Sequence, residues 1–182
     1  MTLSLPDLGT GGLDALRAVI RLPRVPDWAT TPEQRRRLIE EETALHDDLV
    51  AYCYAYDAAD LDAVVAHFAD DVVITNPRGR YTGSDLIRKN YAFLFEQWPR
   101  TRQIWANVAV RFPASFDEAF RASYVYGFLT SPKKNFAAIG TDLHRLRRID
   151  GRWKIVERWI TDDVSYTIAP FGGPLEDTSK AP

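Results

Sequence analysis

The chain has 182 residues, 46 % of them hydrophobic, and a net charge of −2. This length and composition suit one compact domain with its own core and exclude wholesale disorder. The nearly balanced charge does not favour binding to nucleic acid or to an anionic membrane surface, which normally needs a basic face. No apolar run approaches the roughly 20 residues that span a bilayer, and the N-terminal residues do not resemble a signal peptide. We therefore expect a cytoplasmic protein without membrane contact.

Cofactor-dependent chemistry has no signature in this sequence. The single cysteine, Cys53, excludes an intrachain disulfide and a site with several thiolate ligands. No cluster of His, Asp or Glu has the spacing of a metal site, and neither a Gly-rich phosphate loop nor a Gly-x-Ser-x-Gly motif occurs. These observations disfavour metal-dependent, nucleotide-dependent and covalent mechanisms, and we expect no cofactor.

Residues 1–32 are rich in Pro, Gly and Thr and are expected to form an N-terminal arm. Apolar residues at helical spacing predict a short helix over 13–22, which Pro23 and Pro26 end. We interpret the arm as a strap that packs on the domain or on a second subunit, with a lid over a pocket as the alternative. At the other end, residues 171–182 are expected to form a loose tail.

Two helices, a hairpin and a third helix are predicted in the next part of the chain. A long helix begins after Thr31 and runs to about Ala58, because apolar residues recur on one face. Asp60 is the expected cap of a short second helix. The predicted elements are helices over 33–58 and 61–68, a strand over 72–75, a turn over 76–80, a return strand over 81–83, and a helix capped by Ser84 and stopped by Pro99.

Long strands follow these helices and set the fold class. They are predicted over 101–112, 118–130, 135–149 and 153–160, with an extension of the last strand to Ile168 as an option. Strands that follow helices in this way predict an α+β fold. We expect a conical, curved antiparallel sheet wrapped around three helices over residues 33–170, with an apolar cavity between sheet and helices.

Three groups of residues, within about residues 35–168, resemble the SnoaL-like branch of the nuclear transport factor 2-like superfamily. They are Tyr56-Asp57 with Asp60, Asp62, His67, Phe68, Asp70 and Asp71; Tyr81 and Gly83 before the third helix; and Gly140, Asp142 and His144 leading to Asp150-Gly151, Trp153, Ile155 and Arg158. The resemblance implies a conical barrel with a deep pocket, in a group that includes scytalone dehydratase, ketosteroid isomerase, a dehydrochlorinase and polyketide cyclases. Many of these are cofactor-free and dimeric, so a homodimer is expected.

The resemblance also implies roles for individual residues. In the dehydratase and dehydrochlorinase relatives, an aspartate on the first helix orients a histidine on the first long strand, and the histidine abstracts a proton. Asp57 matches the aspartate, whereas Gln103 stands at the position of the histidine. A glutamine amide does not titrate and cannot replace that base. Arg158 matches a pocket arginine of the dehydrochlorinase, and Tyr52 falls where that enzyme presents a lysine.

Asp57 is the first candidate catalytic residue, because it ends an otherwise apolar and aromatic helix. Burial among aromatic side chains would raise its pKa and make it a usable base. The alternatives are a helix-junction cap or an ion pair with Arg158. Gln103 and Asn107 would point the same way on one strand if no bulge intervenes, and their amides could stabilise an oxyanion. The alternative for both is a buried amide satisfied by backbone.

His144 and Arg158 complete the candidate catalytic set. His144 shares a strand face with Asp142 and could replace the missing histidine from across the cavity; a structural histidine is the alternative. Arg158 could attract a carboxylate, a carbonyl or a leaving group, or form an ion pair with Asp57 or Asp142. The candidate substrate-binding residues are Tyr52, Tyr56, Trp105, Asn107 and Tyr124.

We therefore predict a cofactor-independent enzyme acting on a hydrophobic, oxygenated small molecule, of the kind found in secondary metabolism. The reaction would be a proton transfer: elimination, isomerisation or cyclisation. Two alternatives keep the same fold. One is a non-catalytic protein that binds a small molecule. The other is a dimeric accessory subunit, as in the β subunits of ring-hydroxylating dioxygenases, which share this fold.

Overall fold

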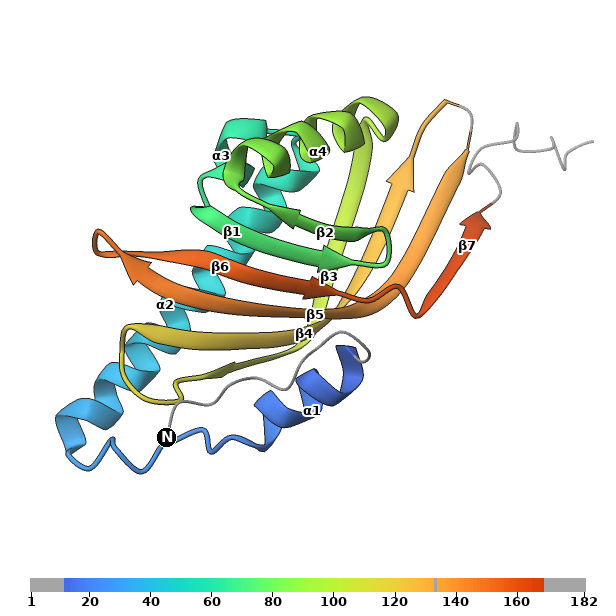
Figure 1. Cartoon of the computed structure of the whole chain (residues 1–182). Coiled ribbons are helices and arrows are strands. Elements are labelled where there is room, and N and C mark those ends of the chain that lie inside the picture. Colours follow the sequence, from blue (N-terminus) through green and yellow to red (C-terminus); the bar gives the residue numbers. More distant parts are fainter. Residues whose placement is uncertain (1–11, 133, 169–182) are drawn as a thin grey trace, which may run out of the picture.

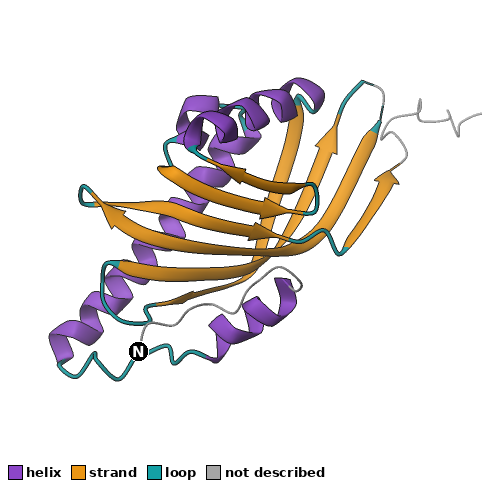
Figure 2. Cartoon of the chain, in the orientation of Figure 1, coloured by secondary structure: helices purple, strands orange, loops and turns teal. Residues whose placement is uncertain are grey.

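The structure, a computed structural model of the chain, describes residues 12–132 and 134–168. The predicted tail over 171–182 lies outside the described residues. The helices are α1 (Gly12–Arg21), α2 (Pro32–Asp57), α3 (Leu61–Val65) and α4 (Ser84–Gln97). The strands are β1 (Phe68–Asn76), β2 (Gly79–Thr82), β3 (Arg100–Arg111), β4 (Glu118–Thr130), β5 (Asn135–Ile149), β6 (Arg152–Ile160) and β7 (Val164–Ile168). Figure 1 shows their arrangement, and Figure 2 separates helices from strands by colour.

The seven strands form one curved, open sheet, which confirms the predicted α+β class. Six of them follow the order β2-β1-β6-β5-β4-β3, and β7 pairs with β5 outside this order. Neighbouring strands are antiparallel except β1 and β6, which run parallel. The segment after β6 does not extend that strand. It forms β7, which pairs with the first part of β5, over 135–139, while β6 pairs with the second part, over 142–149.

Local chemistry explains where the helices begin. Thr31 caps α2 in a reciprocal capping box with Gln34, and the Asp60 side chain accepts from the Ala63 N–H at the start of α3. The predicted cap at Ser84 is wrong: Gly83, with a φ of 89°, holds the N-cap position of α4. Helix α3 is also shorter than predicted, because Phe68 already pairs with β6 as the first residue of β1.

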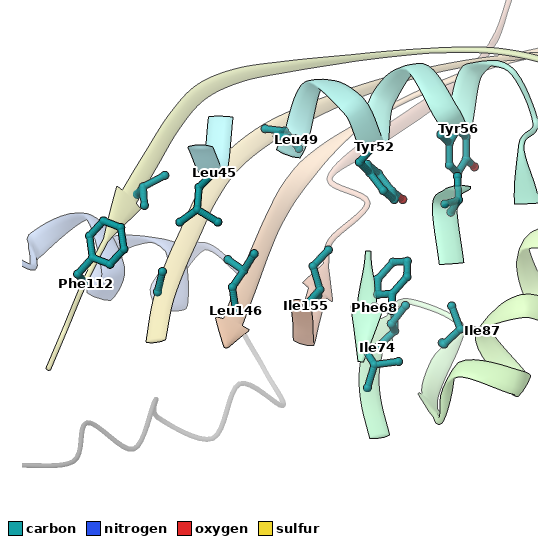
Figure 3. Close-up of a cluster of buried hydrophobic side chains, with 14 of the residues drawn as sticks. Leu45, Leu49, Tyr52, Tyr56, Phe68, Ile74, Ile87, Phe112, Leu146 and Ile155 are labelled. Carbon is teal, nitrogen blue, oxygen red and sulfur yellow. The ribbon is translucent and has the colours of Figure 1, made fainter. Parts of the chain in front are cut away.

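The two faces of the sheet carry different packing. Helices α2, α3 and α4 cover one face, where side chains of α2 meet apolar residues of β1, β5 and β6 in the main core (Figure 3). Helix α1 covers part of the other face. Its Leu16 and Val19 are buried against Phe120, Ala122 and Leu143 of β4 and β5. Since side chains alternate along a strand, the neighbours of these residues, Arg121 on β4 and Asp142 and His144 on β5, point toward α2.

The arm that follows α1 runs along the edge of the domain. Arg111 donates from Nε to the Leu22 carbonyl oxygen at 2.8 Å, and Trp28 donates from Nε1 to the Phe112 carbonyl oxygen at 3.2 Å. Helix α1 therefore has the position of a strap on the outer face of the sheet, not that of a lid over the helix side. Within the described residues, no helix is long and apolar enough to cross a membrane.

Gly140→Ala should destabilise the fold by about 3 kcal/mol, the upper part of the range for overpacking. A methyl group there would lie 1.9 Å from the Thr161 carbonyl oxygen, where the chain passes from β6 to β7. Gly127→Ala is the matched control, since its methyl group would meet its nearest atom, on Leu129, at 3.5 Å. Urea unfolding of both variants measures the difference, and equal losses would contradict this account.

Candidate functional site

A partly open cavity of about 280 Å³ lies between α2, α4 and strands β1 and β3 to β6. This volume is near the lower end of the roughly 300–1,000 Å³ typical of small-molecule sites, so it suits a compact ligand. Much of the wall is apolar, with Ile74, Leu94, Val125, Leu129 and Ile160 among its residues. The polar lining includes Tyr56 and Tyr91 from the helices and Gln103, Asp142 and Arg158 from the strands.

Arg158 is the centre of this polar lining and is 4 % exposed. Its Nε donates to both carboxylate oxygens of Asp142, at 3.2 and 3.0 Å, and its Nη2 donates to Oδ2 at 2.5 Å. Burial acts to raise the pKa of Asp142, but Arg158 and His144 outweigh it and hold that pKa below its ordinary value. The carboxylate therefore stays ionised and keeps the guanidinium in place.

The other side of the guanidinium meets two tyrosine hydroxyls. Nη1 of Arg158 donates to Tyr52 and to Tyr91, both at 2.7 Å, and the two hydroxyl oxygens lie 3.0 Å apart. One hydroxyl hydrogen bridges the two oxygens, which leaves the other free to point elsewhere. Tyr52 is fully buried, whereas Tyr91 lines the cavity. All groups are satisfied when Tyr52 donates to Tyr91 and the Tyr91 hydroxyl offers its hydrogen to the cavity.

His144 lies behind Asp142 and does not line the cavity. Its Nδ1 receives hydrogen bonds from Nε and Nη2 of Arg121, at 3.1 and 2.9 Å. Its Nε2 lies 3.0 Å from Oδ1 of Asp142, but out of line for a hydrogen bond, and has no such partner among the described residues. Burial, with Arg121 and Arg158, lowers the pKa of His144 to about 4, although Asp142 acts to raise it. A fully buried, neutral histidine follows.

Asp57 faces a different hollow, an open groove of about 830 Å³ between α2 and β3. Its side chain is 16 % exposed. Oδ1 accepts from the backbone N–H of Gln103 at 3.2 Å and from the Thr101 hydroxyl at 3.3 Å. Among the described residues, Oδ2 forms an ion pair with Arg102 alone, at 3.9 Å. Burial raises the pKa of Asp57 above its ordinary value, against the lowering effect of these neighbours.

The groove and the cavity adjoin at Gln103, beside Trp105 of the groove wall. Gln103 lines both hollows, and its side-chain oxygen accepts from Nε1 of Trp105 at 3.3 Å. The Trp105 ring packs against Tyr52 and His144, with ring centroids 6.2 and 5.4 Å away. Within the described part of the chain, the amide nitrogen of Gln103 has no hydrogen-bond partner, so it remains available to a ligand.

The structure brings together some of the predicted site residues and separates others. Tyr56 and Arg158 line the cavity with Gln103, whereas Tyr52 supports Arg158 from within the core. Asn107 does not share a face with Gln103: a bulge between Ala106 and Ala109 gives it a φ of 53° and an exposed position. Tyr124 lies on the opposite face of the sheet, in the cluster under α1.

Two residues of the network were not predicted. Tyr91 occupies an apolar position of α4 at helical spacing, and its hydroxyl gives no separate signal in the sequence. Arg121 is fully buried in the middle of β4, between Phe120 and Ala122. Its position between apolar residues of a long predicted strand was the sequence signal that could have indicated a buried arginine. In the described residues, no group of three or more His, Cys, Asp or Glu side chains could hold a metal ion.

His144 should make folding stability depend on pH. An unfolded histidine titrates near 6.5 and His144 near 4, so between these values the unfolded chain binds a proton that the folded chain does not. At about 1.4 kcal/mol per pKa unit, the free energy of unfolding should fall by about 3 kcal/mol across this range as pH decreases.

The variant His144→Gln tests this pH dependence, because glutamine can accept from Arg121 and donate toward Asp142 without titrating. Urea unfolding from pH 7 to pH 4 should show a wild-type loss that the variant lacks. Comparing the two proteins cancels the titration of all other groups. Parallel curves would show that His144 binds its proton as readily in the folded chain.

Comparisons with known proteins agree with this architecture. A structure named as an aromatic ring hydroxylase from Novosphingobium aromaticivorans has 24 % identity and a TM-score of 0.66, over 71 % of this chain and 94 % of that one. One named as a scytalone dehydratase from the same species has 20 % identity and a TM-score of 0.66, over 73 % and 91 %. A type 2 hexachlorocyclohexane dehydrochlorinase has 18 % identity and a TM-score of 0.66, over 75 % and 95 %.

These identities show a shared fold. No curated protein matches the chain. The SnoaL-like domain family matches residues 37–159, which is more than half of the chain and includes the helix of Asp57 and the strands of Gln103, Asp142 and Arg158. The resemblance seen in the sequence is thereby confirmed, and the chain belongs to the SnoaL-like domain family.

Proposed function

We propose that this protein is a cofactor-independent enzyme that transfers a proton on a compact, hydrophobic and oxygenated small molecule. The observation that carries the proposal is the Asp57 carboxylate. One of its oxygens is fixed by Gln103 and Thr101, the other accepts no hydrogen bond from a described residue, and burial raises its pKa. A positioned carboxylate with a free oxygen and a raised pKa has the properties of a general base.

The other carboxylates that line the two hollows are less suited to this role. Both oxygens of Asp142 are engaged by Arg158, and its pKa is held low. Asp162 is exposed and makes no fixed contact with described residues. Asp57 is therefore the proposed base, and Asp142 is a positioning residue for the guanidinium.

Oxyanion stabilisation is the proposed role of Arg158 and Tyr91. The guanidinium has one Nη2 hydrogen without a partner among described residues, and the Tyr91 hydroxyl is polarised by Nη1. Donors that are held in place before the reaction stabilise a developing negative charge on a carbonyl or leaving-group oxygen. Gln103 lines both the groove and the cavity, so it would contact a substrate that extends from the oxyanion donors to the base.

The scytalone dehydratase and dehydrochlorinase likenesses favour elimination or a related proton transfer, since both printed names describe eliminations. The aromatic core around Tyr56 and Tyr91 favours a ring-containing substrate.

A suitable probe is 5-nitrobenzisoxazole: a base removes its ring C–H proton, the N–O bond breaks and a coloured phenolate forms. This single step needs one base and one oxyanion site and consumes no other reagent.

Asp57→Asn should lower kcat/KM for 5-nitrobenzisoxazole by about 10²- to 10⁴-fold, the usual contribution of a general base. Wild-type activity should rise with pH to a plateau, because only the ionised carboxylate accepts a proton. The midpoint should lie above the ordinary aspartate value of 3.8, since burial raises this pKa. Stopped-flow absorbance over a pH series measures both effects.

Asp62→Asn is the matched control for this experiment, because its side chain is 86 % exposed and pairs with Arg88 near the same helix junction. It should retain the wild-type rate. Circular dichroism and thermal unfolding should show both variants folded. Full activity in Asp57→Asn would exclude Asp57 as the base.

Tyr91→Phe should lower kcat/KM by about 10²-fold, the usual cost of one lost oxyanion donor, with the pH midpoint unchanged. The midpoint is unchanged because the base remains in place. Tyr81→Phe, outside the cavity, is the control and should behave as wild type. Unaltered turnover in Tyr91→Phe would place the oxyanion elsewhere.

A further inference from the structure

A row of charged and polar side chains crosses the core behind the cavity. Arg121 is fully buried in β4. Its Nη1 donates to the Leu45 carbonyl oxygen at 2.7 Å and to Oδ2 of Asp48 at 3.1 Å, while Nε and Nη2 donate to His144. Asp48 in turn contacts Nδ1 of His67 at 2.8 Å. The guanidinium therefore joins a carboxylate near the surface to the imidazole behind the cavity.

The hydrogen-bond chemistry fixes the state of that imidazole. A guanidinium only donates, so Nδ1 of His144 must present its lone pair to Arg121. The proton of the neutral ring then sits on Nε2, which lies 3.0 Å from Oδ1 of Asp142. A second proton on Nδ1 would point at the guanidinium, where both charge and geometry oppose it.

We propose that Arg121 is a positioning residue that keeps His144 in this neutral tautomer, so that Asp142 retains its full charge for Arg158. The inference rests on the proposed function only in treating Arg158 as the oxyanion-binding group. Arg121 touches neither hollow and acts through two intervening side chains. An imidazolium at position 144 would instead compete with Arg158 for the same carboxylate.

The groups that face His144 come from four elements. They are Arg121 on β4, Asp142 on its own strand β5, Arg158 on β6 and the uncharged Trp105 ring on β3, with Asp48 of α2 reaching it only through Arg121. Removal of Arg121 takes away a cation and leaves the Asp142 carboxylate as a close neighbour. That change favours a protonated ring at near-neutral pH.

Arg121→Met and Arg121→Gln test the tautomer directly. In ¹⁵N-histidine spectra between pH 5 and pH 8, wild-type His144 should remain neutral with its proton on Nε2. In both variants, imidazolium signals should appear as pH falls through this range. The glutamine variant covers the case in which the methionine variant does not fold, because its amide can still donate to Leu45 or Asp48. A neutral His144 throughout this range in a folded variant would overturn the proposal.

Binding of 4-nitrophenolate, an oxyanion probe, measures the consequence at Arg158. At pH 6, Arg121→Met should bind it at least about tenfold more weakly than wild type, a change of about 1.4 kcal/mol, and this difference should vanish by pH 9. The double variant Arg121→Met/His144→Gln should lose the pH dependence of that difference, since the titrating group is gone. Comparing variant and wild type at the same pH removes the effect of the probe's own ionisation.

The outcomes separate this inference from the proposed function. A pH-independent defect in Arg121→Met, or one that survives in the double variant, would contradict positioning through His144. A wild-type protein that gives the expected ¹⁵N signals but no turnover of 5-nitrobenzisoxazole would contradict the proposed function and leave the tautomer assignment standing.

Discussion

A guanidinium buried at a cavity wall needs a full negative charge beside it, and Asp142 supplies that charge to Arg158. Removal of one partner from a buried ion pair typically costs about 3–5 kcal/mol, because the other charge is left uncompensated. The pair also joins β5 and β6 to α2 and α4, since Nη1 of Arg158 holds the hydroxyls of Tyr52 and Tyr91. The geometry of this ion pair therefore fixes the polar lining of the cavity. Its charge balance restricts the charge of the side chain behind it, His144.

That charge balance extends through the core in alternating signs. Arg121 lies between Asp48 and the neutral His144, and Asp142 lies between His144 and Arg158. Each buried cation thus has one carboxylate, and the imidazole separates the two pairs without adding a charge. A proton on His144 would give the row an excess positive charge in a medium that solvates ions poorly. The depressed pKa of His144, about 4, is the consequence.

Patterns of residue spacing predicted the order of helices and strands and part of the polar network. Alternation along β5 correctly placed Asp142 and His144 on one face, and the ion pair between Arg158 and Asp142 was one of the stated alternatives. The bulge at Asn107 was not predicted: asparagine adopts a positive φ more readily than most residues, but its place in an alternating strand pattern did not indicate a bulge. Tyr124 was misplaced because its face depends on where α1 packs, which is a tertiary contact. A buried role for Arg121 was not predicted, because charged residues in strands usually face solvent.

The glutamine at position 103 gives Asp57 its particular character. A histidine there could become an imidazolium beside the carboxylate and would lower the pKa of Asp57. Gln103 carries no charge, and it binds Asp57 through its backbone N–H, so only one carboxylate oxygen is committed. Burial then dominates and raises the pKa of Asp57. An uncharged side chain at 103 leaves the neighbouring carboxylate more basic than an imidazolium would, so the proposed chemistry does not require a histidine at that position.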